Sequence, residues 1–192
     1  MDQIQFYLND LGQLLSGLPV AEIRRVVDRL LLAYRENRRL ILLGNGGSAA
    51  TASHLVADFQ KMIYLSGGQP FRAMACTDSM PLVTAWANDT DYTGVFAEQV
   101  RTWAEPGDVV LAISGSGNSP NVLRAVAVAR EIGATTIGLS GFSGGKLAEM
   151  VYISIVVPSD NMQRIEDAHM VLGHLFFWRM RQAVEEAGGA RP

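Results

Sequence analysis

Apolar residues recur along this chain in two spacing patterns, and each pattern predicts a different kind of secondary structure. Over residues 2–17 and 20–37 they return every three or four positions, which predicts two amphipathic helices separated by Gly17 and Pro19. Further on, short apolar runs bounded by turn residues predict strands. These runs cover residues 39–43, 71–76, 108–113, 134–139 and 151–156, and helical patterns cover 48–62, 119–132 and 161–186.

The alternation of strands with helices predicts an α/β fold, a doubly wound parallel sheet covered by helices on both faces. We expect residues 38–187 to form this domain and 188–192 to form a frayed tail. Residues 1–37 form a helical extension whose apolar faces pack either on the domain or on another subunit, and both alternatives stay open. Because ligands of such sheets bind beyond the carboxyl ends of the strands, the loops that follow strands are the first place to look for a site.

Composition narrows the classes of function. The 192 residues are 48% hydrophobic and 18% charged, which is typical of a well-packed globular protein. A formal net charge of -3 provides no broad basic field, so we expect no nucleic-acid partner, and phosphate recognition must be local. The single cysteine, Cys76, excludes an internal disulfide framework. We find no signal-peptide pattern and no membrane-spanning stretch, and we expect a cytoplasmic protein without a membrane partner.

The first predicted strand runs into a glycine-rich loop, Gly44-Asn45-Gly46-Gly47-Ser48, before a helix. Glycines let the backbone approach a ligand closely, and the amides at a helix N-terminus favour an anion. The loop lacks the lysine of a nucleotide P-loop, and its glycine spacing differs from that of a dinucleotide fingerprint. Taken alone, the loop is equally compatible with a purely structural strand-to-helix turn.

The third predicted strand opens into a second loop, Ser114-Gly115-Ser116-Gly117-Asn118-Ser119, followed by Pro120. Ser119 suits the N-cap of the next helix and Pro120 its first turn. Three hydroxyl groups therefore converge in front of a helix N-terminus, which favours a phosphate-binding loop over a serine-rich turn with one capping residue.

These two loops, separated by Asn88-Asp89, together resemble the SIS (sugar isomerase) domain family, and within it the phosphoheptose isomerases. The resemblance extends over nearly the whole chain, from the N-terminal helices to the last helix. It implies a five-stranded SIS fold, a flavodoxin-like sandwich, usually assembled as a homotetramer with active sites at subunit interfaces. It also implies a phosphorylated sugar as substrate. The residues expected to bind it are Asn45, Gly46, Gly47, Ser48, Asn88, Asp89, Ser114, Gly115, Ser116, Ser119 and Glu166.

Histidines and carboxylates on two predicted helices form a second set of candidates. His54 and Asp58 lie four residues apart and share one helical face, while Glu166 and His174 lie roughly on one side of the last helix. From spacing alone, these residues are expected to form solvent-exposed polar faces of the two helices and no metal site. The resemblance implies instead one zinc ion per subunit, held by His54, Asp58, Glu166 and His174. His169 is rotated away from the face shared by Glu166 and His174, and we expect it to be structural or at an interface.

The chain departs from the family at two of these positions, because Asp58 stands where the family has glutamate and Glu166 where it has glutamine. The family glutamate is regarded as the proton-transfer base, so either Asp58 or Glu166 is the candidate base here, with His174 exchanging a proton during ring opening. The resulting hypothesis is isomerisation of sedoheptulose 7-phosphate to D-glycero-D-manno-heptose 7-phosphate for surface-polysaccharide synthesis. The alternative is a non-catalytic SIS protein that binds a protein partner, similar to the DnaA-binding replication regulator.

Overall fold

A single parallel sheet organises the structure, a computed structural model that describes residues 2–187, except the side chain of Met62. Within this range the sheet has five strands in the order β2-β1-β3-β4-β5, and every neighbouring pair is parallel. The predicted fold class and all five predicted strands are confirmed. The strands are β1 (Arg39–Gly44), β2 (Arg72–Ala75), β3 (Val109–Ser114), β4 (Thr135–Ser140) and β5 (Ile153–Val156).

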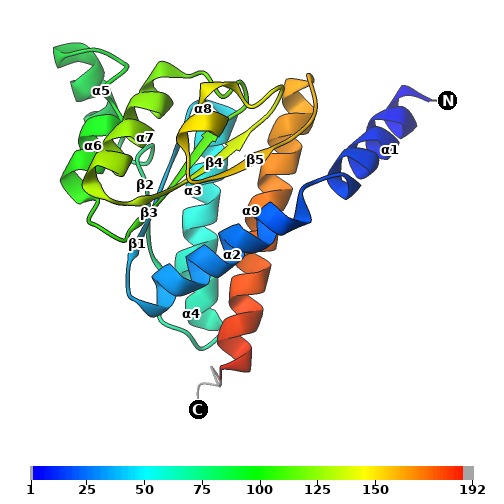
Figure 1. Cartoon of the computed structure of the whole chain (residues 1–192), viewed down its shortest axis with the longest axis horizontal. Helices are drawn as coiled ribbons and strands as arrows, with labels where there is room; N and C mark the ends of the chain where they lie inside the picture. Colours follow the sequence, from blue (N-terminus) through cyan, green and yellow to red (C-terminus); the bar gives the residue numbers. More distant parts are fainter. Residues whose placement is uncertain (1, 188–192) are drawn as a thin grey trace.

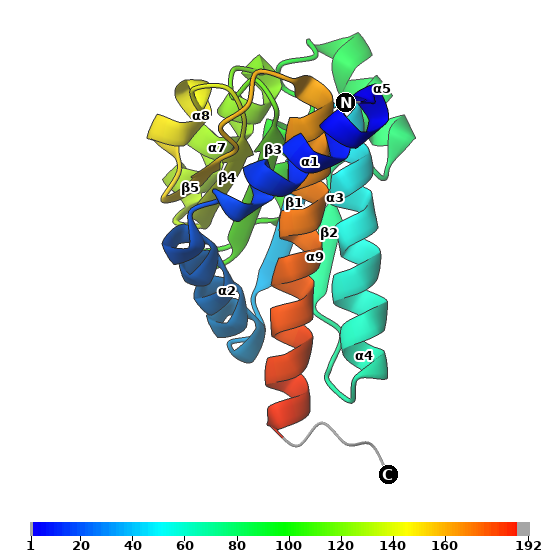
Figure 2. The ribbon, with the colours of Figure 1, turned by 90° about the vertical axis from the view of Figure 1, so that its right-hand side faces the viewer.

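Helices cover both faces of the sheet, as Figures 1 and 2 show. On one face α2, α3 and α9 pack in one apolar core, and on the other face α6, α7 and α8 pack in a second. The short helices α5, α6 and α8 were not predicted individually. The helices are α1 (Gln3–Ser16), α2 (Val20–Arg35), α3 (Gly47–Ala57), α4 (Ile63–Leu65), α5 (Met80–Asp89), α6 (Ala97–Trp103), α7 (Pro120–Ile132), α8 (Gly145–Met150) and α9 (Met162–Glu186).

Strand β3 explains why the predicted strands are unbroken apolar runs. Val109, Leu111 and Ile113 enter the core under α2, α3 and α9, whereas Val110 and Ala112 enter the core under α6 and α7. All five side chains are fully buried. Because a parallel sheet covered on both faces has no solvated side, successive residues must all be apolar.

The strand order places the two glycine-containing loops side by side. From β1 the chain moves to β2 at one edge, and it then crosses to β3 on the other side of β1. The ends of the two central strands are in register, with Gly44 of β1 opposite Ile113 of β3. A crevice opens at such a reversal of strand order, which is the usual ligand position in open α/β sheets.

Helix α3 continues into a π-helical segment, Asp58–Met62, and then into α4. The segment begins at one of the candidate ligands. One wider turn inside an α-helix changes the direction of the side chains that follow, and such turns are frequent at functional sites. The π-helical turn was not predicted, because its sequence carries the same apolar spacing as the rest of the helix.

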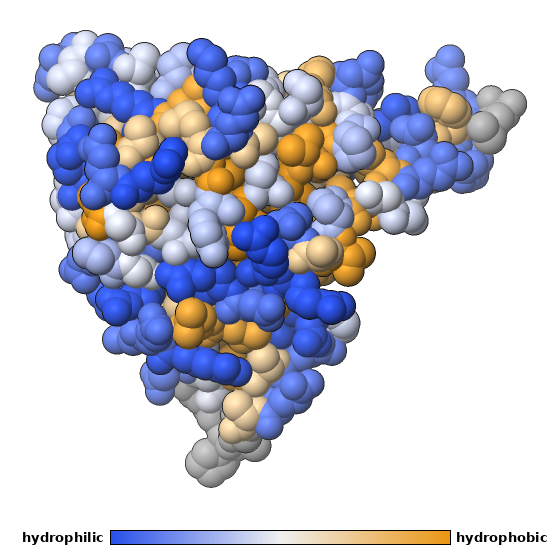
Figure 3. Space-filling view, viewed as in Figure 1, coloured by the Kyte–Doolittle hydropathy of each residue, from blue (hydrophilic) through white to orange (hydrophobic). Residues whose placement is uncertain are grey.

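The two N-terminal helices pack differently. Val26 and Leu30 of α2 are fully buried in the core, whereas none of residues 3–16, which form α1, is buried. Helix α1 projects from the body in Figure 1 and exposes Ile4 and Leu8, and apolar and hydrophilic residues are interspersed on the face drawn in Figure 3. Helix α2 is therefore part of the core.

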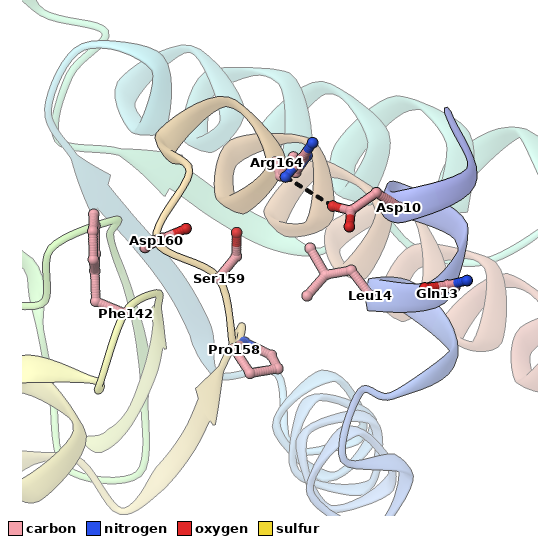
Figure 4. Close-up of a pocket in the computed structure, with 8 residues that line it drawn as sticks. All are labelled: Asp10, Gln13, Leu14, Phe142, Pro158, Ser159, Asp160 and Arg164. Atoms are coloured by element: carbon pink, nitrogen blue, oxygen red, sulfur yellow. Dashed lines mark ion pairs between the residues drawn. The ribbon is translucent and has the colours of Figure 1, made fainter. Parts of the chain in front are cut away.

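Polar contacts hold α1 against the start of α9. The Asp10 carboxylate pairs with the Arg164 guanidinium at 2.8 Å, and the Tyr7 hydroxyl donates to Asp167 at 2.5 Å. Figure 4 shows this junction, where Asp10 and Leu14 face Arg164 and Ser159 across a pocket. Among residues 2–187, no helix is both long and apolar enough to cross a membrane.

Candidate active site

The first loop, between β1 and α3, is shaped by two glycines. Gly46 has φ 55° and ψ -122°, a combination open to glycine but not to residues with a side chain. Gly47 lies against Glu166, because a Cβ atom at Gly47 would stand 2.5 Å from the Glu166 Oε2 atom. Ser48, in the first turn of α3, is buried. The glycines therefore let the loop run close to a carboxylate from the last helix.

The second loop, between β3 and α7, brings two of the predicted hydroxyl groups together. The Oγ atoms of Ser114 and Ser119 lie 3.2 Å apart, and Ser114 is only 4% exposed. Ser119 occupies the N-cap position and Pro120 opens α7, as predicted, but the Ser119 hydroxyl makes no capping hydrogen bond to the helix. It is therefore directed into the loop, toward Ser114.

The remaining residues of the second loop are held by hydrogen bonds to backbone N–H groups. Ser116 is exposed, and its Oγ accepts from the Asn118 N–H at 3.2 Å. The Gly115 carbonyl accepts from the Gly141 N–H at 2.8 Å, which ties this loop to the one that follows β4. These hydrogen bonds hold the loop at the carboxyl edge of the sheet, where Ser114, Ser116 and Ser119 lie.

A pair of asparagine side chains joins the two loops. Asn45 Nδ2 donates to Asn121 Oδ1 at 2.9 Å, and Asn121 Nδ2 donates to Asn45 Oδ1 at 2.8 Å. The Tyr92 hydroxyl also donates to Asn45 Oδ1, at 3.0 Å. Asn121 is only 2% exposed. Asn121 and Tyr92 were not predicted, because neither belongs to a spacing pattern and only the fold brings them to Asn45.

Asn88 and Asp89 form the last turn of α5, and both are exposed. Their side chains bond to each other, with Asn88 Nδ2 donating to Asp89 Oδ1 at 2.8 Å. No hydrogen bond recorded between described residues joins either of them to the two loops. The nearby segment does approach the first loop, through Tyr92.

The histidine and carboxylate candidates meet between α3 and α9. The Nε2 atoms of His54 and His174 lie 2.9 Å apart, and the Asp58 Oδ2 atom lies 3.5 Å from the first and 3.9 Å from the second. The two imidazole rings are about half exposed, at 48% and 51%, and the Asp58 side chain is 20% exposed. His54 and Asp58 thus share one face, as predicted, and the fold brings His174 of α9 to the same face.

Glu166 stands apart from this cluster. Helices α3 and α9 run alongside each other, so that Glu166 faces Gly47 at the first turn of α3 while His174, two turns further along α9, faces His54. In the described part of the chain, the group of possible metal-ligating atoms lying within 4.8 Å of one another consists of His54, Asp58 and His174. Glu166 instead presents its carboxylate at the first loop.

The donor set of this cluster fits a zinc ion. Zinc prefers imidazole nitrogens and carboxylate oxygens, and two nitrogens bound to one tetrahedral ion lie about 3.3 Å apart. The 2.9 Å separation of the two Nε2 atoms is close to that value. Three protein ligands with solvent access are the arrangement of catalytic zinc sites, which keep one position open.

Two further titratable groups are buried outside the cluster. Burial lowers the pKa of His169 to about 4, and its Nε2 atom lies 3.2 Å from the Ser140 carbonyl oxygen. Burial, with a smaller contribution from the Asp78 carboxylate, raises the pKa of the Cys76 thiol to about 12. Both groups are therefore neutral at pH 7 and lie in the core, which is consistent with the structural role expected for His169.

Comparison with known proteins identifies the family of the chain. The model of the SIS domain matches residues 7–141. The chain therefore belongs to the SIS domain family, as the sequence motifs predicted.

Three of the proteins that the chain resembles within that family are named phosphoheptose isomerases. The chain is 40% identical over 172 residues to a phosphoheptose isomerase of Geotalea daltonii, spanning 89% of this chain and 86% of the relative. It is 44% identical over 151 residues to a phosphoheptose isomerase of Mycobacterium tuberculosis, spanning 79% and 76%. The solved structure of a phosphoheptose isomerase from Neisseria gonorrhoeae superimposes with a TM-score of 0.87 at 30% identity, covering 94% of this chain and 97% of the other.

Proposed function

We propose that this chain is an aldose–ketose isomerase of phosphorylated sugars, and that its substrate is sedoheptulose 7-phosphate, converted to D-glycero-D-manno-heptose 7-phosphate for surface-polysaccharide synthesis. One observation carries the proposal. In a chain 40% identical to a phosphoheptose isomerase, one histidine each from α3 and α9 and a carboxylate from the π-helical segment converge beside two loops suited to a sugar phosphate.

The second loop supplies the phosphate site in this proposal. The hydroxyl groups of Ser114 and Ser119 lie 3.2 Å apart, in front of the N-terminus of α7. Hydroxyl donors and the positive end of a helix dipole together favour a dianion. Ser116 and the backbone of Gly115 extend the same surface, so the phosphate is bound without any arginine or lysine in the loop.

Two carboxylates are available to move the proton. Isomerisation removes a proton from C1 of the ketose and returns one to C2, while the hydroxyl proton passes from O1 to O2 through an enediol. Asp58 lies beside both imidazole rings, whereas Glu166 lies at the sugar-orienting first loop. We assign the proton transfer to Glu166 because Asp58 is already engaged with the two histidines.

The remaining residues would hold the sugar and a metal ion. His54, Asp58 and His174 are the proposed zinc ligands, with Glu166 able to contribute when the metal is present. A bound zinc ion would act as a Lewis acid at the two oxygens of the substrate. Asn45, Gly46, Gly47, Ser48, Asn88 and Asp89 are proposed to orient the sugar chain, and His174 to exchange a proton during ring opening.

A homotetramer with sites at its subunit interfaces forms part of the same proposal. The two imidazole rings of the cluster are about half exposed in the single chain, and α1 carries exposed apolar residues, among them Ile4 and Leu8. A neighbouring subunit covering these surfaces would exclude water from the reacting atoms and strengthen every electrostatic contact there.

The competing hypothesis is a non-catalytic SIS protein that binds a protein partner. Such a protein has no use for two histidines and a carboxylate meeting at 2.9–3.9 Å. The changed carboxylates Asp58 and Glu166 are the feature in its favour. The geometry of the cluster supports the enzyme.

The test is direct conversion. The purified protein, supplied with zinc, is incubated with sedoheptulose 7-phosphate, and aldose formation is followed by NMR with and without a chelator. Zinc-dependent conversion is the expected result. If the folded protein binds the sugar phosphate but converts none of it, the proposed substrate is wrong, and either another phosphosugar or the partner-binding hypothesis replaces it.

A further inference from the structure

The orientation of the Asn45 side-chain amide is determined by its neighbours. Rotation of an asparagine amide by 180° exchanges its oxygen and nitrogen, and the torsion that allows this is soft. An amide that can turn presents either a donor or an acceptor to a ligand. The neighbours of Asn45 therefore decide which of the two it offers.

A backbone group starts the chain of contacts. The Val122 N–H donates to Asn121 Oδ1 at 3.0 Å, and a backbone N–H can only donate, so the atom of Asn121 that faces it must be the oxygen. The Asn45 atom that lies 2.9 Å from that same oxygen must then be the nitrogen, Nδ2. Asn121 Nδ2 and the Tyr92 hydroxyl both donate to the other Asn45 atom, Oδ1.

The contacts leave one hydrogen-bonding group of Asn45 for a ligand. Its oxygen already accepts two hydrogen bonds, from Asn121 and Tyr92. Its nitrogen carries two hydrogens, and one of them is used toward Asn121. The second N–H of Asn45 has no partner among residues 2–187. Because Asn45 immediately follows β1, this N–H belongs to the loop at the carboxyl edge of the sheet.

We infer that Asn121 and Tyr92 are positioning residues that lock the Asn45 amide as a hydrogen-bond donor toward an oxygen of the bound sugar phosphate, and that they thereby couple the first loop to the start of α7. The inference rests on the proposed function for the identity of the ligand. Asn121 is 2% exposed and lies in the first turn of α7, so it is shielded from a ligand and would reach one through Asn45. Tyr92 is 54% exposed and acts from the solvent side.

Two substitutions test the two contacts. Tyr92→Phe removes one hydroxyl from an exposed ring, and Asn121→Ala removes both hydrogen bonds to Asn45 together with the one from the Val122 N–H. We expect KM for sedoheptulose 7-phosphate to rise roughly threefold in Tyr92→Phe and roughly tenfold in Asn121→Ala, with kcat changed less. The reason is that losing one neutral hydrogen bond changes an affinity by roughly three- to tenfold. Tyr152→Phe is the matched control, since Tyr152 is 68% exposed and precedes β5 at the opposite edge of the sheet.

A double-mutant cycle separates positioning from folding. If Asn121 acts through Asn45, then Asn121→Ala has no further effect on kcat/KM in an Asn45→Ala background. A purely structural role would give the same loss in both backgrounds, together with a lower melting temperature, and that outcome would overturn the inference. Tyr92→Phe repeats the test at an exposed position where unfolding is not expected.

A spectroscopic measurement keeps this result independent of turnover. The side-chain NH2 signals of Asn45, assigned by their loss in Asn45→Ala, are followed in ¹⁵N-labelled protein during titration with sedoheptulose 7-phosphate and, separately, with inorganic phosphate. We expect the sugar phosphate to shift one of the two Asn45 hydrogens strongly, and Tyr92→Phe to weaken that response. Absence of turnover in the wild type would overturn the proposed function, whereas an Asn45 signal indifferent to ligand would overturn the inference.

Discussion

The Nε2 atoms of His54 and His174 lie 2.9 Å apart although 120 residues separate them in the chain. Asp58 Oδ2 lies within 3.9 Å of both. Two imidazoles and a carboxylate are brought together because α3 and α9 pack side by side on the same face of the sheet. This contact between two helices creates a candidate metal centre that neither helix could form alone.

Substitution of His174 by alanine tests that centre. We expect His174→Ala to lower kcat/KM for sedoheptulose 7-phosphate by roughly 100-fold or more, since a positioned acid–base group contributes at least that factor. Zinc content, measured by mass spectrometry of the purified protein, should fall in parallel. Full turnover in the variant would remove the cluster from the mechanism, and His169→Gln on the same helix serves as the comparison outside the cluster.

Glu166→Gln separates the two candidate bases. We expect kcat to fall by roughly 100-fold because the carboxylate at the first loop is lost, while bound zinc is retained. Asp58→Asn should instead reduce zinc binding. The measurements are kcat as a function of pH and metal content, with Glu185→Gln, an exposed residue paired to Arg181 on the same helix, as the matched control. Unchanged kcat in Glu166→Gln would transfer the proton-transfer role to Asp58.

The paired hydroxyls of the second loop should govern phosphate affinity. Ser114→Ala and Ser119→Ala are each expected to raise KM roughly tenfold, because a hydrogen bond to a charged group contributes about 1.5–3 kcal/mol. Inhibition by inorganic phosphate should weaken by a similar factor. Ser16→Ala is the control, since that hydroxyl bonds to the Gly12 carbonyl within α1. Equal phosphate inhibition in all three variants would place the phosphate elsewhere.

His169 predicts a fall in stability on acidification. Its pKa is about 4 in the folded protein, against about 6.5 in an unfolded chain. Between pH 6.5 and 4 the unfolded state therefore binds a proton that the folded state does not. The free energy of unfolding should fall through this window by roughly 3 kcal/mol. Urea denaturation of wild type and His169→Gln at pH 7.5 and 4.5 measures the difference, and an equal acid sensitivity of the two would contradict the prediction.

The attachment of α1 can be loosened without unfolding the domain. Arg164 pairs with Asp10, and its guanidinium also lies over the ring of Tyr7 at 5.3 Å (Figure 4 shows the ion pair). Arg164→Met should speed proteolytic cleavage within residues 2–17 several-fold, while global stability changes by only about 1 kcal/mol. Arg181→Met, which removes an ion pair further along α9, is the control and should leave cleavage of α1 unchanged.

The sequence alone was sufficient to predict the five strands, the long helices and the two loops. The buried strands are unbroken apolar runs. An apolar run of that length between turn residues is typical of a buried strand and too short for most helices. The pairing of His54 with Asp58 was equally accessible, because the spacing of four residues within one helix needs no tertiary information.

Tertiary packing decided the rest of the site. It placed Glu166 at Gly47 and left His54, Asp58 and His174 as the compact group, although helical spacing alone had put Glu166 and His174 on one side of α9. It also brought Asn121 and Tyr92 to Asn45 across long intervals of chain. Local periodicity predicts which face of a helix a residue occupies. Contacts between two helices also depend on their relative position along their axes, and only the packing of the core determines that position.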